Sequence, residues 1–256
     1  MRPSVKGVLL CGIATLAGSF AGCGGGNDSD PCYSLKVAGG NLCQTLPTSV
    51  AVLIADNKLC TGTFITARHV ITAAHCMPRR GGEVRVAVQG FSRTSKRFAI
   101  HPSYRQGGLS PYDVAIVQLD VDANVTPAPL VGSQEVERGD TLIAYGYGLD
   151  ELGNALPERI EQRESPLKAT YLEANAVNED FIQTVSDGGG DTCQGDSGGP
   201  VLLEPDGSDE FGLVAVTSFG PNICAVDSGL PSGNTNLQSE SVREFIVKNA
   251  PNVRFN

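Results

Sequence analysis

Ser197 and His75 are the two side chains whose sequence settings are most typical of nucleophilic chemistry. Ser197 lies in the run Gly-Asp-Ser-Gly-Gly-Pro at residues 195–200, and His75 lies in Thr-Ala-Ala-His-Cys at residues 72–76. A serine hydroxyl is a weak nucleophile at neutral pH, so it needs a neighbouring base, and an imidazole can accept its proton. A Gly-Asp-Ser-Gly run taken alone is equally compatible with an ordinary turn.

Asp113 lies between these motifs, in Tyr-Asp-Val-Ala-Ile-Val-Gln-Leu at residues 112–119. Together the three segments resemble the signatures of the trypsin and chymotrypsin family of serine proteases, and they follow that family's order of His, Asp and Ser. The resemblance implies that Ser197 is the nucleophile, that His75 is the general base, and that Asp113 fixes the imidazole tautomer. It also assigns Ser218 to support the carboxylate.

The residues before Ser197 are expected to bind the substrate. In the resemblance, the backbone N–H groups of Gly195 and Ser197 form the oxyanion hole. Asp191 matches the floor of the primary pocket, where a carboxylate pairs with Arg or Lys and penalises apolar side chains. Its alternative role is to cap the turn after the three preceding glycines. Gly220 matches a glycine that keeps the pocket open, whereas Ser232 falls at the opposite wall and would narrow it.

An activation junction is expected near the start of the chain. The segment Lys-Val-Ala-Gly-Gly at residues 36–40 resembles the family's zymogen cleavage site. Cleavage after Lys36 would free the Val37 ammonium, which would form a buried ion pair with Asp196 and order the oxyanion loop. Because Lys36 also suits a pocket floored by Asp191, self-activation is one hypothesis. The alternative is that this segment is only the end of a flexible linker.

Residues 1–22 are expected to be an export signal. Two basic residues precede a short apolar stretch, and Phe-Ala-Gly-Cys at residues 20–23 resembles a bacterial lipoprotein cleavage box. The lipid would then be attached to Cys23, anchoring the exported protein to a membrane of the bacterial cell envelope. Because the box begins with Phe rather than Leu, an ordinary signal and a secreted protein are the alternative. Residues 23–36 are interpreted as a lipid-attached tether and activation peptide.

The chain has eight cysteines. Cys11 would leave with the signal and Cys23 would carry lipid, so six cysteines remain for three disulfides in an oxidising compartment. Their spacing does not suit a metal site, and no metal or cofactor is expected. The resemblance implies the pairs Cys60–Cys76 and Cys193–Cys224, and the remaining pair is Cys32–Cys43.

Residues 37–256 are expected to form one all-β catalytic domain. The resemblance implies a chymotrypsin-like fold of two packed six-stranded antiparallel β-barrels with the catalytic residues in the cleft between them. A C-terminal α-helix is predicted over 240–249, capped by Ser239. Short apolar runs separated by turn residues agree with a β fold; they lie at 50–55, 62–66, 84–88, 114–119, 142–145 and 213–218.

The net charge of -9 and the pI of about 4.8 argue against a nucleic-acid partner. The expected partners are protein or peptide substrates with Arg or Lys at the cleaved position, and the protein is expected to be a monomer. Two functional hypotheses remain. The first is an active serine endopeptidase, and the second is a binding protein that keeps the protease fold without turnover. The presence of all the matched catalytic residues favours the first.

Overall fold

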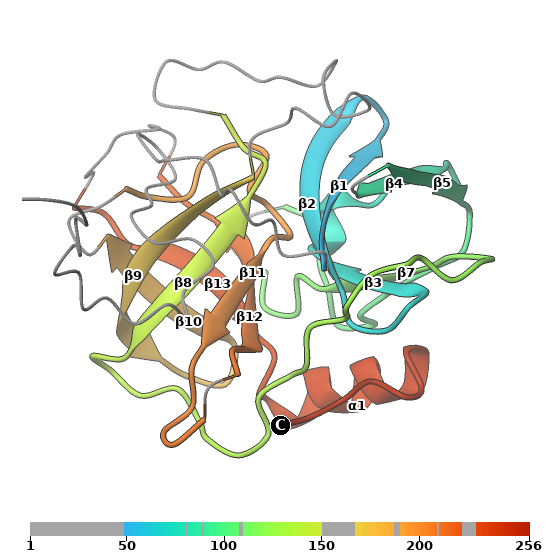
Figure 1. Cartoon of the computed structure of the whole chain (residues 1–256). Helices are drawn as coiled ribbons and strands as arrows, with labels where there is room; N and C mark the ends of the chain where they lie inside the picture. The colour runs from blue at the N-terminus through green and yellow to red at the C-terminus, as the bar shows by residue number, and fades with distance from the viewer. Residues whose placement is uncertain are drawn as a thin grey trace, which may run out of the picture.

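The computed structural model describes most of the chain after residue 48. The described residues are 49–79, 81–88, 90–107, 110–149, 167–186, 190–208, 210–221 and 229–256. Strands dominate this part of the chain and form two β-structures that lie side by side (Figure 1). Within these residues, no helical segment has the length and apolar content needed to cross a bilayer.

The first β-structure is built from seven antiparallel strands. They are β1 (Val50–Ala55), β2 (Lys58–Phe64), β3 (His69–Thr72), β4 (Val84–Val88), β5 (Phe91–Ser95), β6 (Phe98–Ile100) and β7 (Ala115–Gln118). Their order is β5-β4-β1-β2-β3-β7-β6, so the two edge strands are consecutive in the chain. Only Lys96 and Arg97 separate them. Because one continuous segment pairs with β4 and then with β7, the sheet curls into a barrel whose sixth strand is divided in two.

The second β-structure is a closed six-stranded barrel. Its strands are β8 (Thr141–Gly146), β9 (Lys168–Val177), β10 (Phe181–Ser186), β11 (Pro200–Leu203), β12 (Gly212–Phe219) and β13 (Ser232–Asn236). The order is β10-β13-β12-β11-β8-β9, and antiparallel pairing of β9 with β10 completes the barrel. The expected two-barrel architecture is therefore confirmed.

Apolar side chains fill each barrel and also the contact between the barrels. The first strand reads Val-Ala-Val-Leu-Ile-Ala without the alternation typical of a half-exposed strand, because both of its faces are covered. Leu53 belongs to the core of the first barrel, whereas Val50 packs against Ile143, Tyr145 and Leu167 of the second. This second contact holds the two halves of the molecule together.

Helix α1 (Glu240–Asn249) has the predicted bounds, and its apolar face of Val242, Phe245 and Ile246 is buried in the core cluster of the first barrel. The chain thus returns from the second barrel to cover the first (Figure 1). The predicted side-chain cap was wrong. Ser239 occupies the N-cap position with extended backbone, but its hydroxyl donates to the Asn236 carbonyl at 3.4 Å in the preceding turn and makes no cap hydrogen bond.

Several sequence predictions fall outside the described residues. They concern the export signal, the cysteine predicted to carry lipid, the activation junction, the Cys32–Cys43 disulfide and one cysteine of the Cys193–Cys224 disulfide. The residues are Cys23, Cys32, Lys36, Val37, Cys43 and Cys224.

Candidate active site

His75 and Asp113 lie in direct contact, although 38 positions separate them in the chain. A 3₁₀ turn, η1 (Ala74–Cys76), follows β3 and presents His75. The imidazole Nδ1 lies 2.6 Å from Asp113 Oδ2, and the His75 backbone N–H donates to Asp113 Oδ1 at 2.8 Å. Since a carboxylate accepts, Nδ1 carries the proton, and Nε2 is left with a lone pair that can accept a proton from a nucleophile.

Asp113 is 4% exposed and is held by groups from both barrels. Ser218, on β12, donates its hydroxyl to Asp113 Oδ2 at 2.6 Å. Thr235, on β13, donates its hydroxyl to the Asp113 carbonyl at 3.2 Å. The predicted contact of Ser218 is therefore present, while Thr235 is a supporting residue that the sequence motifs did not reveal. A carboxylate with this many donors keeps one position, and so does the imidazole bound to it.

The Ser197 backbone forms a hydrogen bond with strand β2, which lies next to the His75 turn. The Thr61 N–H of β2 donates to the Ser197 carbonyl at 2.9 Å. Cys76 Sγ lies 3.7 Å from the same carbonyl oxygen, which places Ser197 beside the neighbour of His75. The structure therefore brings the predicted nucleophile, base and carboxylate to one place at the junction of the two barrels.

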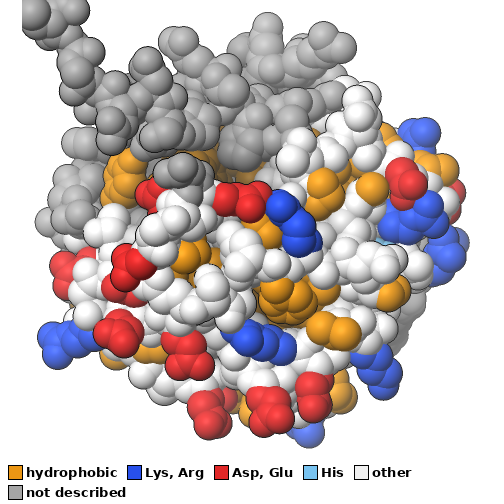
Figure 2. All heavy atoms as spheres, turned by 60° about the horizontal axis from the view of Figure 1, so that its bottom comes forward, with side chains coloured by type: hydrophobic (Ala, Val, Ile, Leu, Met, Phe, Trp, Pro, Cys, Tyr) orange, Lys and Arg blue, Asp and Glu red, His pale blue; other side chains and the backbone are white. Residues whose placement is uncertain are grey.

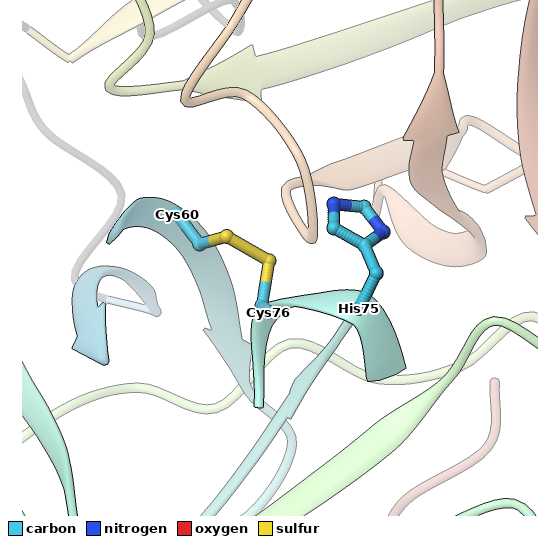
Figure 3. Close-up of side chains that lie close together, drawn as sticks. All are labelled: Cys60, His75 and Cys76. Atoms are coloured by element: carbon cyan, nitrogen blue, oxygen red, sulfur yellow. A yellow bond between two sulfur atoms is a disulfide. The ribbon is translucent and has the colours of Figure 1, made fainter. Parts of the chain in front are cut away.

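The Cys60–Cys76 disulfide stabilises the position of the His75 turn. The predicted bond is present, and Figure 3 shows it tying this turn to the strand that carries Cys60. His75 and the two sulfur atoms lie within 4.8 Å of one another, an arrangement that superficially resembles a metal site. Because the two sulfurs are bonded to each other, they are not thiolate ligands. Cys193 is also disulfide-bonded, and its predicted partner lies outside the described residues.

The glycines around Ser197 are required by close packing. Gly198 has φ 83°, and a Cβ there would overlap the Thr72 hydroxyl and the Thr61 carbonyl. Gly195 has φ 98°, and a Cβ there would come within 2.9 Å of the Gly148 backbone. Both values lie in the left-handed region that favours glycine. The glycines of the motif therefore allow this loop to pack directly against β2, β3 and the Gly148 backbone.

Asp196 anchors the loop on which the proposed oxyanion hole lies. Its side chain is buried at 1% exposure and accepts hydrogen bonds from the Gly148 N–H and the Cys193 N–H, both at 2.7 Å. Thr61 also contributes, because its hydroxyl donates to the Gly195 carbonyl at 2.8 Å. The backbone of residues 193–197 is therefore held by Gly148 and Thr61 from outside the loop and by the Cys193–Asp196 contact within it.

Asp191, the predicted pocket floor, is 2% exposed. Its Oδ1 accepts from the Thr192 N–H at 2.7 Å and from the Ser232 hydroxyl at 2.8 Å. Ser232 was predicted at the pocket wall, and it lies against the floor carboxylate itself. A Cβ on Gly220 would come 3.0 Å from the Ser232 Oγ, so this glycine faces the same hydroxyl. The structure therefore groups the three predicted pocket residues.

Lys58 is a residue near the site that the sequence motifs missed. Its ammonium donates to the His75 carbonyl at 3.1 Å. Partial burial lowers the pKa of Lys58, an effect reinforced by Arg79 and opposed by the negative charge of Asp113. Lys58 lies at the start of β2, outside all the sequence motifs, so the sequence gave no reason to place it near His75.

The other two histidines, His69 and His101, have contacts with nearby residues of their own segments. His69 Nδ1 lies 2.8 Å from the Thr66 hydroxyl, and His101 Nδ1 accepts from the Ser103 N–H at 3.2 Å. Burial lowers the pKa of both imidazoles. His75 is therefore the only histidine placed beside the proposed nucleophile.

Comparisons with known proteins agree with this geometry. The family model described as Trypsin matches residues 38–243. Kallikrein 1-related peptidase b1 of Mus musculus is 27% identical over 235 residues, covering 78% of this chain and 85% of the relative. Hypodermin-A of Hypoderma lineatum is 26% identical over 268 residues, covering 96% and 98%.

A solved structure shares the fold. Neuropsin, a serine protease expressed in the limbic system of mouse brain, matches with a TM-score of 0.61 and 24% identity. The match covers 79% of this chain and 94% of neuropsin. The family match spans both barrels and every predicted catalytic residue, and the chain belongs to the trypsin family of serine proteases.

Proposed function

We propose that this protein is a serine endopeptidase that hydrolyses peptide bonds after Arg or Lys. The observation that carries the proposal is the His75–Asp113 contact at 2.6 Å, made beside the segment that contains Ser197. General-base catalysis requires a buried aspartate, held by several hydrogen bonds, that orients a partly exposed imidazole, and this is the arrangement of Asp113 and His75. Membership of the trypsin family supports the same reaction class.

In the proposed reaction, His75 Nε2 accepts the Ser197 hydroxyl proton as the serine oxygen attacks the scissile carbonyl carbon. The Asp113 carboxylate stabilises the imidazolium that forms. The N–H groups of Gly195 and Ser197 donate to the oxyanion of the tetrahedral intermediate. His75 then gives the proton to the leaving amine, an acyl-enzyme remains on Ser197, and water releases it by the reverse sequence of proton transfers.

The proposed preference for Arg or Lys rests on Asp191. A buried carboxylate at the end of a pocket favours a cationic side chain, because an apolar one would leave the charge without a counterion. Ser232 and Gly220 would line the approach to it. The partners are then proteins or peptides with a basic residue at the cleaved position.

We propose further that the protein is made as a zymogen and is activated by cleavage after Lys36. The buried Asp196 carboxylate supports this, since it is the acid with which a new Val37 ammonium would pair.

Export and lipid attachment at Cys23 remain a proposal from the sequence. Replacing Cys23 by Ser should move the protein from the detergent phase to the aqueous phase, and an unchanged partition would indicate an ordinary secretory signal.

The test of the activity uses matched peptide amides ending in Arg, Lys, Leu or Phe, before and after cleavage at Lys36. We expect the cleaved form to hydrolyse the Arg and Lys amides, and the Ser197→Ala variant to be inactive. Equal rates on the Leu and Phe amides would contradict the role of Asp191. If the cleaved protein hydrolyses none of the amides, the result favours the second hypothesis, a binding protein that keeps the protease fold without turnover.

A further inference from the structure

A groove of about 1240 Å³ lies over helix α1, outside the proposed catalytic and pocket residues. Four glutamates line it, two from the helix and two from loops of the second half of the molecule: Glu135, Glu179, Glu240 and Glu244. We call it the α1 groove. In Figure 2, which turns the α1 side of the molecule forward, acidic and apolar side chains lie next to one another on the surface.

The charge of the α1 groove is unbalanced. All four glutamates are exposed, and among the described residues none of them forms an ion pair. Two basic residues, Arg243 and Lys248, also line the groove. The Arg243 guanidinium donates to the Val131 carbonyl at 3.1 Å, so part of its hydrogen-bonding capacity is already used. The groove therefore presents an excess of negative charge.

The groove also contains apolar contact surface. Val247 is 51% exposed and Phe255 is 39% exposed, although both are large apolar residues. Tyr112 lines the same groove and is partly buried. Exposed apolar side chains next to acidic ones match a ligand that carries both basic and apolar groups.

Tyr112 connects this groove with the proposed catalytic aspartate. It precedes Asp113 in the chain, and its backbone has φ 65°, a conformation that is rare and costly for an aromatic residue. The Val114 N–H donates to the Tyr112 carbonyl at 2.7 Å, so Asp113 is the central residue of a tight turn. The position of the Tyr112 ring and that of the Asp113 carboxylate are therefore linked by a short, constrained backbone.

The Tyr112 ring also contacts the helix side of the groove through His101. The two rings are stacked, with centroids 4.7 Å apart and planes at 9°. His101 contacts two residues of α1. Its Nε2 lies 3.3 Å from the Ser241 carbonyl, and its ring centroid lies 5.1 Å from that of Phe245. A ligand that presses on α1 or on Tyr112 would act on this stack.

We propose that the α1 groove is a docking site for a cationic polypeptide segment with apolar side chains, and that its occupancy is transmitted to Asp113 through Tyr112. The transmission to catalysis rests on the proposed function, whereas the docking does not. A second copy of this chain is a poor occupant, because each copy carries a net charge of -9. Nucleic acid is excluded by the same sign of charge.

The test uses the three histidines of the chain as reporters. Full-length protein with ¹⁵N-labelled histidine and the substitutions Ser197→Ala and Asp191→Asn is titrated with a short peptide of lysine and leucine, so the peptide is not cleaved and the proposed lysine pocket lacks its charge. We expect saturable shifts of the His101 and His75 imidazole signals. His69, held by Thr66, is the internal reference and should not move.

Matched variants separate docking from transmission. Replacing the four glutamates by glutamine should weaken peptide binding about tenfold, since complementary charge is removed. Replacing Glu83, Asp120, Glu173 and Glu204 by their amides instead, four exposed acids that do not line the groove, should leave binding within about twofold. Equal binding by the groove variant, or by a peptide of glutamate and leucine, would overturn the docking site.

Tyr112→Gly tests the transmission, because glycine accepts φ 65° and the variant has no ring to stack on His101. The peptide should still bind through the glutamates, but the His75 signal should no longer shift. Tyr112→Phe keeps the ring and should behave as the parent does. A His75 shift that persists in Tyr112→Gly, or that is absent in the parent, would overturn the link. Because this titration uses a variant without turnover, loss of the proposed protease activity would be seen separately, in the peptide-amide assay.

Discussion

The Ser232 hydroxyl donates a hydrogen bond to Asp191 Oδ1 at 2.8 Å, and both residues are buried. This pair determines what a substrate side chain would meet at the end of the proposed pocket. One carboxylate oxygen is already engaged, and the hydroxyl occupies space that faces Gly220. An ammonium needs a single contact, whereas a guanidinium binds a carboxylate best through two parallel hydrogen bonds. For the pocket proposed above, we therefore expect a preference for Lys over Arg.

Replacing Ser232 by Gly should shift the ratio of kcat/KM for Arg and Lys amides towards Arg by about tenfold, because removing the hydroxyl beside Asp191 leaves more room for the larger guanidinium. The measurement is the initial rate on the matched Arg and Lys amides. Ser232→Ala removes the hydroxyl but keeps the Cβ, so it distinguishes the hydrogen bond from the space it occupies. An unchanged ratio in both variants would show that Ser232 does not determine the preference.

Replacing Ser218 by Ala should lower kcat about tenfold or more and change KM little. The variant removes the 2.6 Å hydrogen bond to Asp113 Oδ2, and a hydrogen bond to a charged group contributes about 1.5–3 kcal/mol. Steady-state kinetics on the preferred amide give the two constants. Ser95→Ala, on β5, is the control for loss of a buried hydroxyl that also donates at 2.6 Å, here to the Gln118 carbonyl. A Ser218 variant with parental kcat would mean that Asp113 is positioned without it.

Replacing Gly198 by Ala should prevent stable folding or reduce the free energy of unfolding by more than about 3 kcal/mol. Its Cβ would overlap backbone and side-chain atoms of β2 and β3, and it would come within 2.9 Å of the Ala73 nitrogen. Gly207 is a matched control, because it also has a positive φ of 73° but nothing lies within 4 Å of its Cβ position. Gly207→Ala should cost only about 1 kcal/mol. Urea unfolding compares the two, and similar losses would contradict the packing argument.

His101 should make the protein less stable as the pH falls below about 6.5. Burial lowers its pKa in the folded state, so between that pKa and its ordinary value the unfolded chain binds more protons than the folded one. The stability is present above about pH 6.5 and is lost as the pH falls towards the folded-state pKa. Protonation of Nδ1 would also abolish the acceptor used by the Ser103 N–H.

The check is urea unfolding across this pH range for the parent and for His101→Phe, which keeps an aromatic ring against Tyr112 but cannot titrate. The variant should lose less stability than the parent on acidification. His69, whose pKa is lowered in the same direction, remains in both proteins and accounts for a shared part of the loss. Identical pH profiles would show that His101 does not contribute.

The catalytic candidates could be predicted because their chemistry restricts the residue types in short motifs. The glycines around Ser197 show the link most clearly, since the motif that identifies the nucleophile is also the one that β2 and β3 need for close packing. Apolar runs likewise predicted several strands, and β1 and β4 have the expected bounds. Such runs appear in the sequence because burial of apolar side chains is what places them in a barrel.

Strand β13 shows what only the tertiary structure decided. It reads Ser-Gly-Asn-Thr-Asn and all five residues are buried, so its sequence resembles an exposed turn. Several of its side chains donate hydrogen bonds to distant partners, although Asn234 Oδ1 has no partner among the described residues. Ser232 donates to Asp191, Asn234 donates to the Ile182 carbonyl, and Thr235 donates to the Asp113 carbonyl.

The sequence by itself therefore determined the family, the catalytic residue types and the strands that apolar burial requires. The tertiary structure decided which polar strand lies between β10 and β12 in the second barrel, how Ser232 binds Asp191 and how Thr235 supports Asp113. Polar groups can be buried wherever distant donors and acceptors meet them, and that pairing depends on the folded arrangement rather than on any local pattern.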